Sequence, residues 1–136
     1  MADLSVYAAN MIGNHMLRGA VFTPPATIYV ALFSAATGLD DNNPTSEIAG
    51  SGYARQTITL SEFAARASAN VGDISFPVAG EDWLEATHFA IVDHLSNTNW
   101  GTNVNVLMWD ALTTPRTCLQ GDQAKYLEGA LDVTFE

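Results

Sequence analysis

Residues spaced three and four positions apart mark the first segment of the chain as an amphipathic helix. The repeat consists of Leu4, Ala8, Met11, Ile12, His15 and Met16, which form one broad stripe on a helix. Asp3 at its start complements the helix dipole, and Arg18 and Gly19 mark its end, before the two prolines at 24–25. We therefore expect a helix within residues 1–19, whose stripe packs either on the chain's own sheet or on a neighbouring subunit.

Beyond the prolines the pattern changes to the period of two that is typical of β-strands. The segment Thr27–Phe33, TIYVALF, is rich in β-branched and aromatic residues, as in a buried central strand. Five further strands are predicted: Tyr53–Leu60, Ile74–Val78, Thr87–Asp93, Val104–Trp109 and Leu131–Phe135. Pro77 places one of them at an edge or a bulge. The pattern predicts a mainly β fold, an antiparallel β-sandwich or barrel-like domain with one N-terminal amphipathic α-helix.

Two segments between the strands have no regular pattern. Residues 34–51 form a loop rich in Gly, Asp, Asn, Pro and Ser, and loops of this length are uncommon in isolated compact domains. A neighbouring subunit is therefore a candidate for ordering it. Residues 61–69 are open between a short helix and an irregular crossover. We expect one domain over residues 1–136, with the helix in 1–19 and the β domain in 26–136.

The charge balance is strongly acidic, with fifteen Asp or Glu, five Lys or Arg and a formal net charge of -10. The few cations are spread along the chain, so we expect no direct binding of nucleic acid and no attraction to an anionic membrane. The longest apolar runs are far shorter than the ~20 residues of a membrane-spanning helix. The N-terminus lacks a basic stretch before its apolar residues, so we expect no signal peptide and synthesis in a cytoplasm.

The overall composition is that of a globular protein, with 48% hydrophobic residues. Charged residues make up only 15% of the chain, against about 25% in a typical soluble domain. Some apolar surface is therefore expected to bind partners. Cys118 is the one cysteine, which excludes an internal disulfide, and we interpret it as a small buried hydrophobe and not as a nucleophile.

The sequence contains no recognisable metal or cofactor motif. His15, His88 and His94 lack the close spacing of a zinc site. Five side chains of the long loop offer oxygen ligands for calcium, namely Asp40, Asp41, Asn42, Asn43 and Glu47. Their spacing does not fit the twelve-residue calcium loop, so a solvated loop is the favoured interpretation. Glycine-rich phosphate loops and a serine elbow are also missing from the sequence, and we expect no metal and no cofactor.

One acidic cluster raises the alternative of an enzyme. Glu81, Asp82 and Glu85 flank Trp83, and paired carboxylates near an aromatic residue can act in sugar hydrolysis. A chain of this size leaves little room for a deep substrate cleft. The three tryptophans, Trp83, Trp100 and Trp109, either stack on a sugar or pack in the core. We therefore expect no enzyme, and keep a small carbohydrate-active enzyme as a remote alternative.

Several strings along the chain carry a resemblance to a known family. In order, they are IYVALF from Ile28, GSGYARQ from Gly50, FP at Phe76, THFAIVD from Thr87, MWDALT from Met108 and GD…GALDVT from Gly121. Together they resemble a family of small tailed-bacteriophage virion structural proteins often labelled tail-fibre-like, over nearly the whole chain. The resemblance implies a virion component that is synthesised in the cytoplasm of the bacterial host.

The physical features of the chain favour one position in the virion. A receptor-binding fibre is usually an elongated trimer with repeats or a stalk, and the sequence has neither. We therefore favour a capsid decoration (cement) protein that binds the major capsid protein and stabilises the head shell. The alternative is a tail-associated or tail-fibre-like subunit that binds tail proteins. In both cases an acidic chain would meet a basic rim on its partner.

We expect the subunit to form a homo-oligomer, a dimer or a trimer, because closed assemblies of this kind are the usual arrangement. Two groups of residues are candidates for the partner interface. They are the helix-face residues Tyr7, Met11 and Met16, and the loop residues Leu39, Asp40, Asp41 and Ile48.

Overall fold

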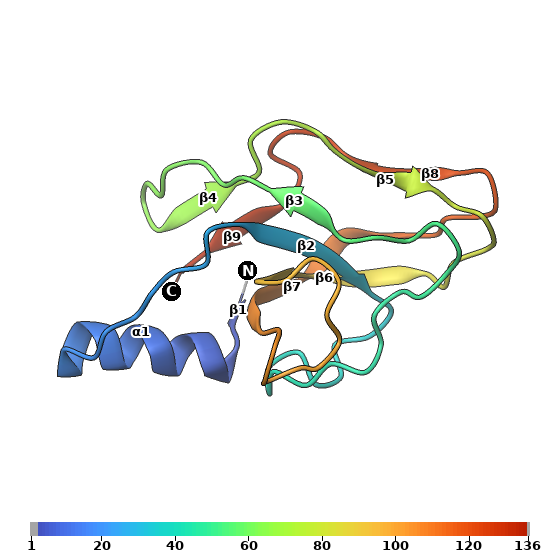
Figure 1. The fold of residues 1–136 in the computed structure, drawn as a ribbon. Helices are drawn as coiled ribbons and strands as arrows, with labels where there is room; N and C mark the ends of the chain where they lie inside the picture. The colour runs from blue at the N-terminus through green and yellow to red at the C-terminus, as the bar shows by residue number, and fades with distance from the viewer. Residues whose placement is uncertain (1–2, 136) are drawn as a thin grey trace.

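The protein consists mainly of antiparallel β-sheets with one N-terminal helix, as a computed structural model of residues 3–135 describes it (Figure 1). The elements are β1 (Asp3–Leu4), α1 (Val6–Arg18), β2 (Ile28–Phe33), β3 (Gln56–Ile58), β4 (Ala67–Ala69), β5 (Ile74–Val78), β6 (Ala86–Val92), β7 (Val106–Arg116), β8 (Gln123–Tyr126) and β9 (Asp132–Thr134). The expected mainly β class is confirmed. The sheets stay open and form no closed barrel. Residues 1–2 and 136, the ends of the expected helical and β segments, lie outside the described range.

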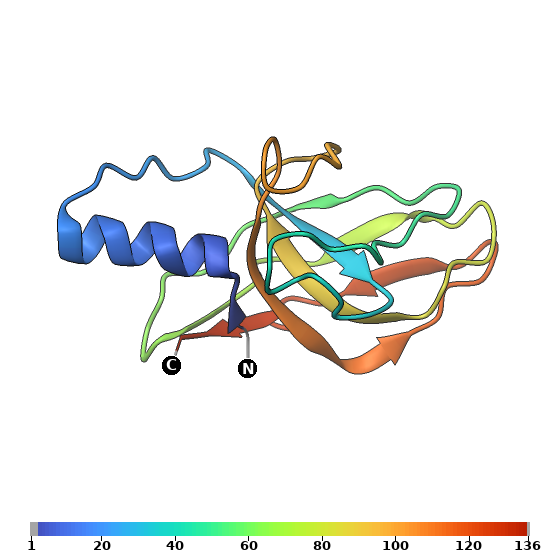
Figure 2. The same cartoon turned by 90° about the horizontal axis from the view of Figure 1, so that it is seen from below.

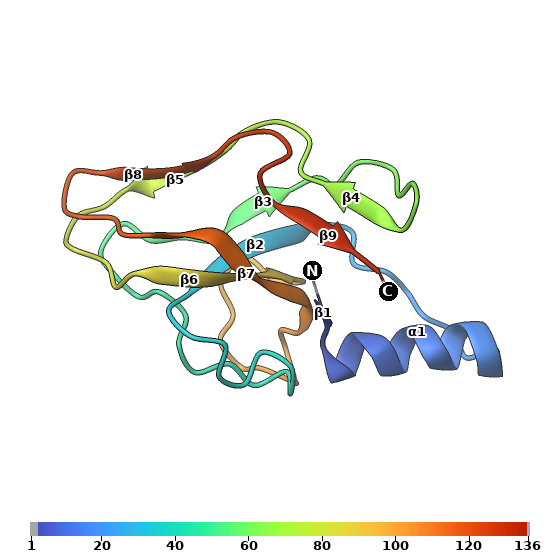
Figure 3. The same ribbon diagram turned by 180° about the vertical axis from the view of Figure 1, so that it is seen from behind.

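The strands are arranged in two layers (Figures 1 and 3). A five-stranded sheet has the order β1-β7-β6-β2-β3, and the pairs β4-β9 and β5-β8 lie over one of its faces. Two loops, residues 34–51 and 93–105, lie on the other face. The predicted central strand Thr27–Phe33 is confirmed as β2, which pairs with β6 on one side and β3 on the other.

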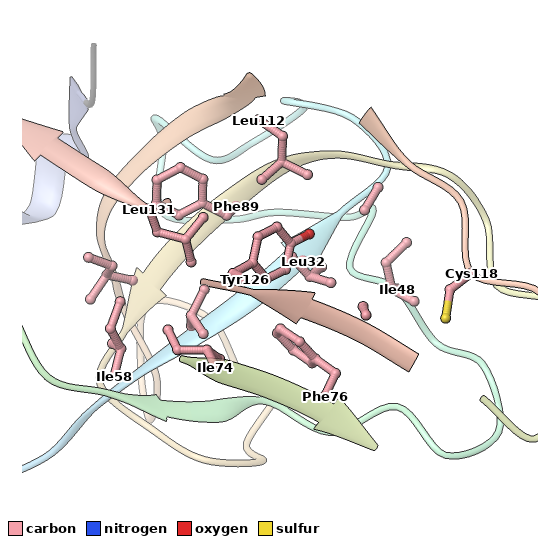
Figure 4. Packing of buried hydrophobic residues seen from close by; sticks show 14 of the residues in the cluster. Leu32, Ile48, Ile58, Ile74, Phe76, Phe89, Leu112, Cys118, Tyr126 and Leu131 are labelled. Atoms are coloured by element: carbon pink, nitrogen blue, oxygen red, sulfur yellow. The ribbon is translucent and has the colours of Figure 1, made fainter. Parts of the chain in front are cut away.

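Among the described residues, buried apolar side chains form two clusters, one on each face of the large sheet. Successive residues of a strand point to opposite faces, so β2 contributes Val30 and Leu32 to one cluster and Ala31 and Phe33 to the other. Figure 4 shows the first cluster, in which side chains of β2, β3, β5, β6, β7 and β8 meet between the two layers. Burial on both faces explains why the sequence of β2 is continuously apolar.

The long loop is held by the chain itself, which corrects the expectation that a neighbour orders it. Leu39 is fully buried in the second cluster, and Ile48 is buried in the first. The Ile48 N–H also donates to the Leu32 carbonyl at 2.9 Å. The chain turns back at Gly38, whose φ of +78° favours glycine and whose Cβ, if present, would lie 2.0 Å from the Asn43 carbonyl oxygen. The loop is therefore a part of the fold.

The helix starts later than the sequence predicts. Asp3 pairs with Trp109 in β1, so its expected role at the helix start is wrong, and Leu4 also belongs to that strand. Ser5 is the N-cap and accepts a hydrogen bond from the Ala8 N–H at 3.1 Å. The expected stop at Gly19 is confirmed, because this residue is the left-handed C-cap with φ +69°.

Replacing Ser5 with alanine is expected to lower the free energy of unfolding by about 1–2 kcal/mol. The buried Ser5 hydroxyl caps α1 and also donates to the carbonyl of Val106 in β7, so its loss leaves both groups without a partner. Urea unfolding followed by circular dichroism measures the change. Ser75→Ala, at an exposed position in β5, is the control. Equal losses in the two variants would contradict the role of Ser5.

The remaining strands differ from the prediction mainly in their limits. The expected strand Tyr53–Leu60 is reduced to the three residues of β3. The expected strand Val104–Trp109 corresponds to β7, which begins at Val106 and extends seven residues beyond Trp109, to Arg116. The strands β1, β4 and β8 are not predicted. The undecided segment 61–69 contains a turn, in which Ala65 and Arg66 have positive φ, followed by β4.

Candidate functional site

The most prominent surface feature is an arm formed by α1 and the segment that returns from it, residues 6–27 (Figures 1 and 2). The helix projects from one end of the sheets and contacts β1 and β7 at its base. Of the helix residues, all of which the structure describes, Ala8 is the one that is buried. The helix stripe was expected to pack either on the chain's own sheet or on a neighbouring subunit. Packing on the chain's own sheet is limited to the base of the helix.

The returning segment covers one side of the helix. His15 Nδ1 lies 2.9 Å from the carbonyl oxygen of Ala20, and its ring centroid lies 6.5 Å from that of Phe22. Arg18 Nη1 donates to Asn14 Oδ1 at 3.4 Å, back along the helix. These contacts join helix and returning segment into one unit, so the arm has a defined shape without a neighbour.

Large apolar side chains are exposed at the free end of the arm. Met16 is 71% exposed, Leu17 is 85% exposed and Val21 is 93% exposed, and we call these three residues the arm tip. Single exposed apolar residues are ordinary, but a group at the end of a projection is typical of a protein interaction site. The arm tip is therefore the first candidate site.

The predicted interface residues occupy different environments. Met16 is at the arm tip, and Tyr7 and Met11 are half-buried nearer the base. Burial raises the pKa of the Tyr7 hydroxyl, and the Asp93 carboxylate raises it further. The helix-face interface stays a prediction, with Met16 as its most accessible member.

The loop candidates divide into two pairs. Asp40 and Asp41 are exposed. Leu39 and Ile48 are buried in the core clusters, so the structure corrects these two candidates: their side chains hold the loop and present no surface to a partner. The apolar character that suggested an interface is explained by burial within the same chain.

A groove of about 560 Å³ lies between the two loops of residues 34–51 and 93–105 and is the second candidate site. Its lining is largely apolar and includes Pro44, Ile48, Leu95 and Trp100. Leu95 is an exposed apolar residue at this groove. A volume of this size falls within the range of about 300–1,000 Å³ that is usual for sites that bind a ligand or a side chain.

A hydrogen-bonded group of three side chains forms the polar part of the groove. Glu47 accepts from Arg55 Nε at 2.7 Å and from Arg55 Nη2 at 2.8 Å, which is a bidentate ion pair. The Tyr53 hydroxyl donates to Glu47 Oε1 at 3.0 Å and accepts from the Leu32 N–H at 3.0 Å. Arg55 Nη1 donates to the His94 carbonyl at 2.8 Å, and its guanidinium lies 4.9 Å from the centre of the Trp100 ring. These polar groups bind one another and stabilise the two loops. Because they are already paired, the surface that the groove offers to a ligand is mainly apolar.

The stability of the protein is expected to fall as the pH rises above 10, in part because of Tyr53. Burial raises the pKa of the Tyr53 hydroxyl well above its usual value of 10.0, and the Glu47 carboxylate adds to the shift. The unfolded chain then loses this proton at lower pH than the folded chain, so stability present below pH 10 is lost as the pH rises through the raised pKa. Urea unfolding at a series of alkaline pH values should show a shallower loss in Tyr53→Phe than in the unchanged protein. Equal slopes would contradict the assignment.

The acidic cluster near Trp83 serves to hold loops together. Glu81 Oε1 accepts from the Ser51 N–H at 2.9 Å, and Asp82 Oδ1 accepts from the Gln120 N–H at 2.8 Å. Trp83 is buried, and its Nε1 donates to the Ser51 carbonyl at 3.0 Å. The indole is therefore unavailable for stacking on a sugar, and this cluster gives no support to the remote alternative of a carbohydrate-active enzyme.

Several residues considered for metal binding or for nucleophilic chemistry take part in hydrogen bonds or in the core. Within residues 3–135, no three His, Cys, Asp or Glu side chains gather as metal ligands would. Asn42 of the long loop donates to Asn105 at 2.9 Å and accepts from the Val106 N–H at 2.7 Å.

Cys118 is buried in the first cluster, as expected, and burial raises the pKa of its thiol. In the same described range, α1 is too short to cross a membrane.

The family model described as Podophage GP4 fiber I protein gp80 matches residues 3–134. The match covers nearly the whole chain, from β1 and the arm to the last strand. No curated protein matches the chain.

Proposed function

Because this chain belongs to the podophage fiber I protein gp80 family, we propose that it is a structural subunit of the tail-fibre apparatus that joins neighbouring virion subunits through its arm. The chain is a phage virion fibre protein, and its family is one of structural proteins and not of enzymes. This agrees with the tail-fibre-like resemblance of the sequence. The match favours the tail-associated alternative over capsid decoration, which was the first choice from physical features alone.

The observation that carries the proposal is the exposed arm tip. A soluble chain that kept Met16, Leu17 and Val21 permanently in water would lose the free energy that their burial offers. Complete burial of three such side chains is worth about 4–9 kcal/mol in total. Association of two proteins costs an estimated 4–15 kcal/mol in lost motion and ordering. One arm alone is therefore a weak attachment, and several arms acting together in one assembly bind far more tightly.

The number of copies per particle tests the position in the virion. Quantitative mass spectrometry of purified virions, with the major capsid protein as the internal reference, gives this number directly. We expect a count far below that of the major capsid protein. A count equal to that of the major capsid protein, or a simple large fraction of it, would contradict the tail-fibre position and favour a capsid decoration protein.

The role of the arm is tested by incorporation into virions. Leu17→Glu places a charge on the arm tip, and we expect the variant subunit to be depleted from purified virions because burial of a carboxylate in an apolar contact is costly. Leu84→Glu is the matched control, since Leu84 is 73% exposed on the body of the protein. Equal incorporation of both variants would show that the arm tip is not a part of the attachment surface.

A further inference from the structure

We propose that the arm tip of one copy docks in the groove of a second copy, so that the fibre subunits bind one another through their arms. This inference rests on the proposed function, in which the arm is the attachment element, and it names a second copy of the chain as the partner. The two surfaces involved are the arm tip, Met16, Leu17 and Val21, and the groove between residues 34–51 and 93–105.

The arm tip lies far from the groove of its own chain. In Figures 1 and 2 the free end of α1 points away from the sheets, whereas the loops that form the groove lie beside the large sheet. The base of the arm is fixed by the buried Ser5 and Ala8 and by the contact of α1 with β7. A tip that enters a groove therefore enters the groove of another molecule.

The chemistry of the groove favours an apolar occupant. Pro44, Leu95 and Trp100 contribute apolar surface, and the charged residues of the groove, Glu47 and Arg55, already neutralise each other. A charged ligand would have to compete with this bidentate pair. Aliphatic side chains such as those of the arm tip can enter without breaking it, and they would cover the exposed Leu95 at the same time.

The distribution of charge favours contact through the arm and not through the bodies of two molecules. Residues 6–27 contain one cation, Arg18, and no carboxylate. The rest of the chain carries four Lys or Arg and all fifteen Asp or Glu, so two bodies repel each other at close range. The arm therefore carries a formal net charge of +1 and the body one of -11, and Arg18 is next to Leu17 in the arm tip. Charge complementarity therefore adds to the apolar contact.

The proposed contact joins two different surfaces, which limits the possible assemblies. Two copies can exchange arms reciprocally in a two-fold dimer, or several copies can each dock in the next around a closed ring. In both arrangements every arm tip is covered and every groove is filled. In the expected dimer or trimer, the surfaces that meet are therefore the arm tip of one copy and the groove of the next.

Disulfide trapping between two variants tests the contact directly. One preparation carries Leu17→Cys in the arm tip and the other carries Leu95→Cys at the groove, and the native Cys118 is buried and contributes little background. After mixing and mild oxidation, we expect a cross-linked dimer that contains one chain of each variant. The control mixture pairs Leu17→Cys with Leu84→Cys, at an exposed position on the body. Cross-linking no stronger than in this control would overturn the proposal.

Analytical ultracentrifugation of the purified protein gives a second, independent readout. We expect the unchanged chain to self-associate. Leu17→Glu should raise the dissociation constant about tenfold or more, because one leucine side chain is no longer buried in the contact. Leu84→Glu should associate like the unchanged chain. A monomeric unchanged chain at every concentration would overturn the inference. If Leu17→Glu were still lost from virions in that case, the proposed function would stand with other virion proteins as the partners of the arm.

Discussion

Replacing Phe76 with alanine is expected to lower the free energy of unfolding by about 3–5 kcal/mol. Phe76 comes from β5 and is fully buried between the two layers of the fold (Figure 4). Its ring stacks on Tyr53 with centroids 6.0 Å apart and meets the edge of Tyr126 in β8 at 6.1 Å. Alanine would lose these contacts and leave a cavity that the sheets on both sides are too rigid to close.

Urea unfolding followed by tryptophan fluorescence measures the effect of Phe76→Ala. The matched control is Phe63→Ala, because Phe63 is 41% exposed, and its ring centroid lies 5.1 Å from that of Phe135 near the C-terminus. We expect a clearly smaller loss in the control. A loss below about 1 kcal/mol for Phe76→Ala, the range of ordinary surface changes, would contradict the view that this ring joins the two layers.

Replacing Glu47 with alanine is expected to cost about 3 kcal/mol of stability and to loosen the groove. The side chain of Arg55 is only 3% exposed, so removal of its carboxylate partner leaves a buried cation with incomplete compensation. The Tyr53 hydroxyl loses its acceptor in the same change. A second substitution, Arg55→Met, in the Glu47→Ala background removes the unpaired charge and is expected to restore a part of the lost stability.

The exposed pair formed by Lys125 and Asp73 is the control for Glu47. Lys125 Nζ lies 3.4 Å from Asp73 Oδ2, and both side chains are about half exposed. Lys125→Ala should therefore change the unfolding midpoint only slightly. If Glu47→Ala changed it no more than Lys125→Ala does, the ion pair of Glu47 and Arg55 would be marginal and the proposed basis of the groove's rigidity would be wrong.

Segments with a long and regular pattern could be predicted from the sequence. The continuous apolar run of β2 predicted a central strand, and burial on both faces is the physical reason. The helix end at Gly19 was also predictable, because a left-handed C-cap strongly favours glycine. The helix start was not, because both Asp3 and Ser5 are suitable capping residues and pairing with β7 decides between them.

Short strands without a repeated pattern could not be predicted. The strand β4 has three residues and exists because β9, more than sixty residues later, pairs with it. The last part of β7 contains Pro115, which indicates the end of a strand in isolation, yet Arg116 still pairs with Ala86 across an irregular register. Tertiary pairing therefore decides these segments, and local sequence does not contain the information.

In the candidate site, too, features with a regular sequence pattern could be predicted, and features that depend on tertiary contacts could not. The apolar stripe of the first segment predicted the helix, and Met16 of this stripe is exposed at the arm tip, whereas its role in an interface stays a prediction. Leu39 and Ile48 were selected for their place in a long polar loop, where an apolar residue serves equally well as an anchor to the core. The groove was missed altogether, since Leu95 and Pro44 lie about fifty residues apart and no spacing rule connects them.

Immunogold labelling of intact virions tests the central claim, a place for this subunit in the tail-fibre apparatus. Antibodies against the purified chain, viewed by negative-stain electron microscopy, show whether the label lies at the tail or over the head. The account predicts gold at the tail end of the particle, with little over the head. Label distributed over the head shell would contradict it and would favour a capsid decoration protein.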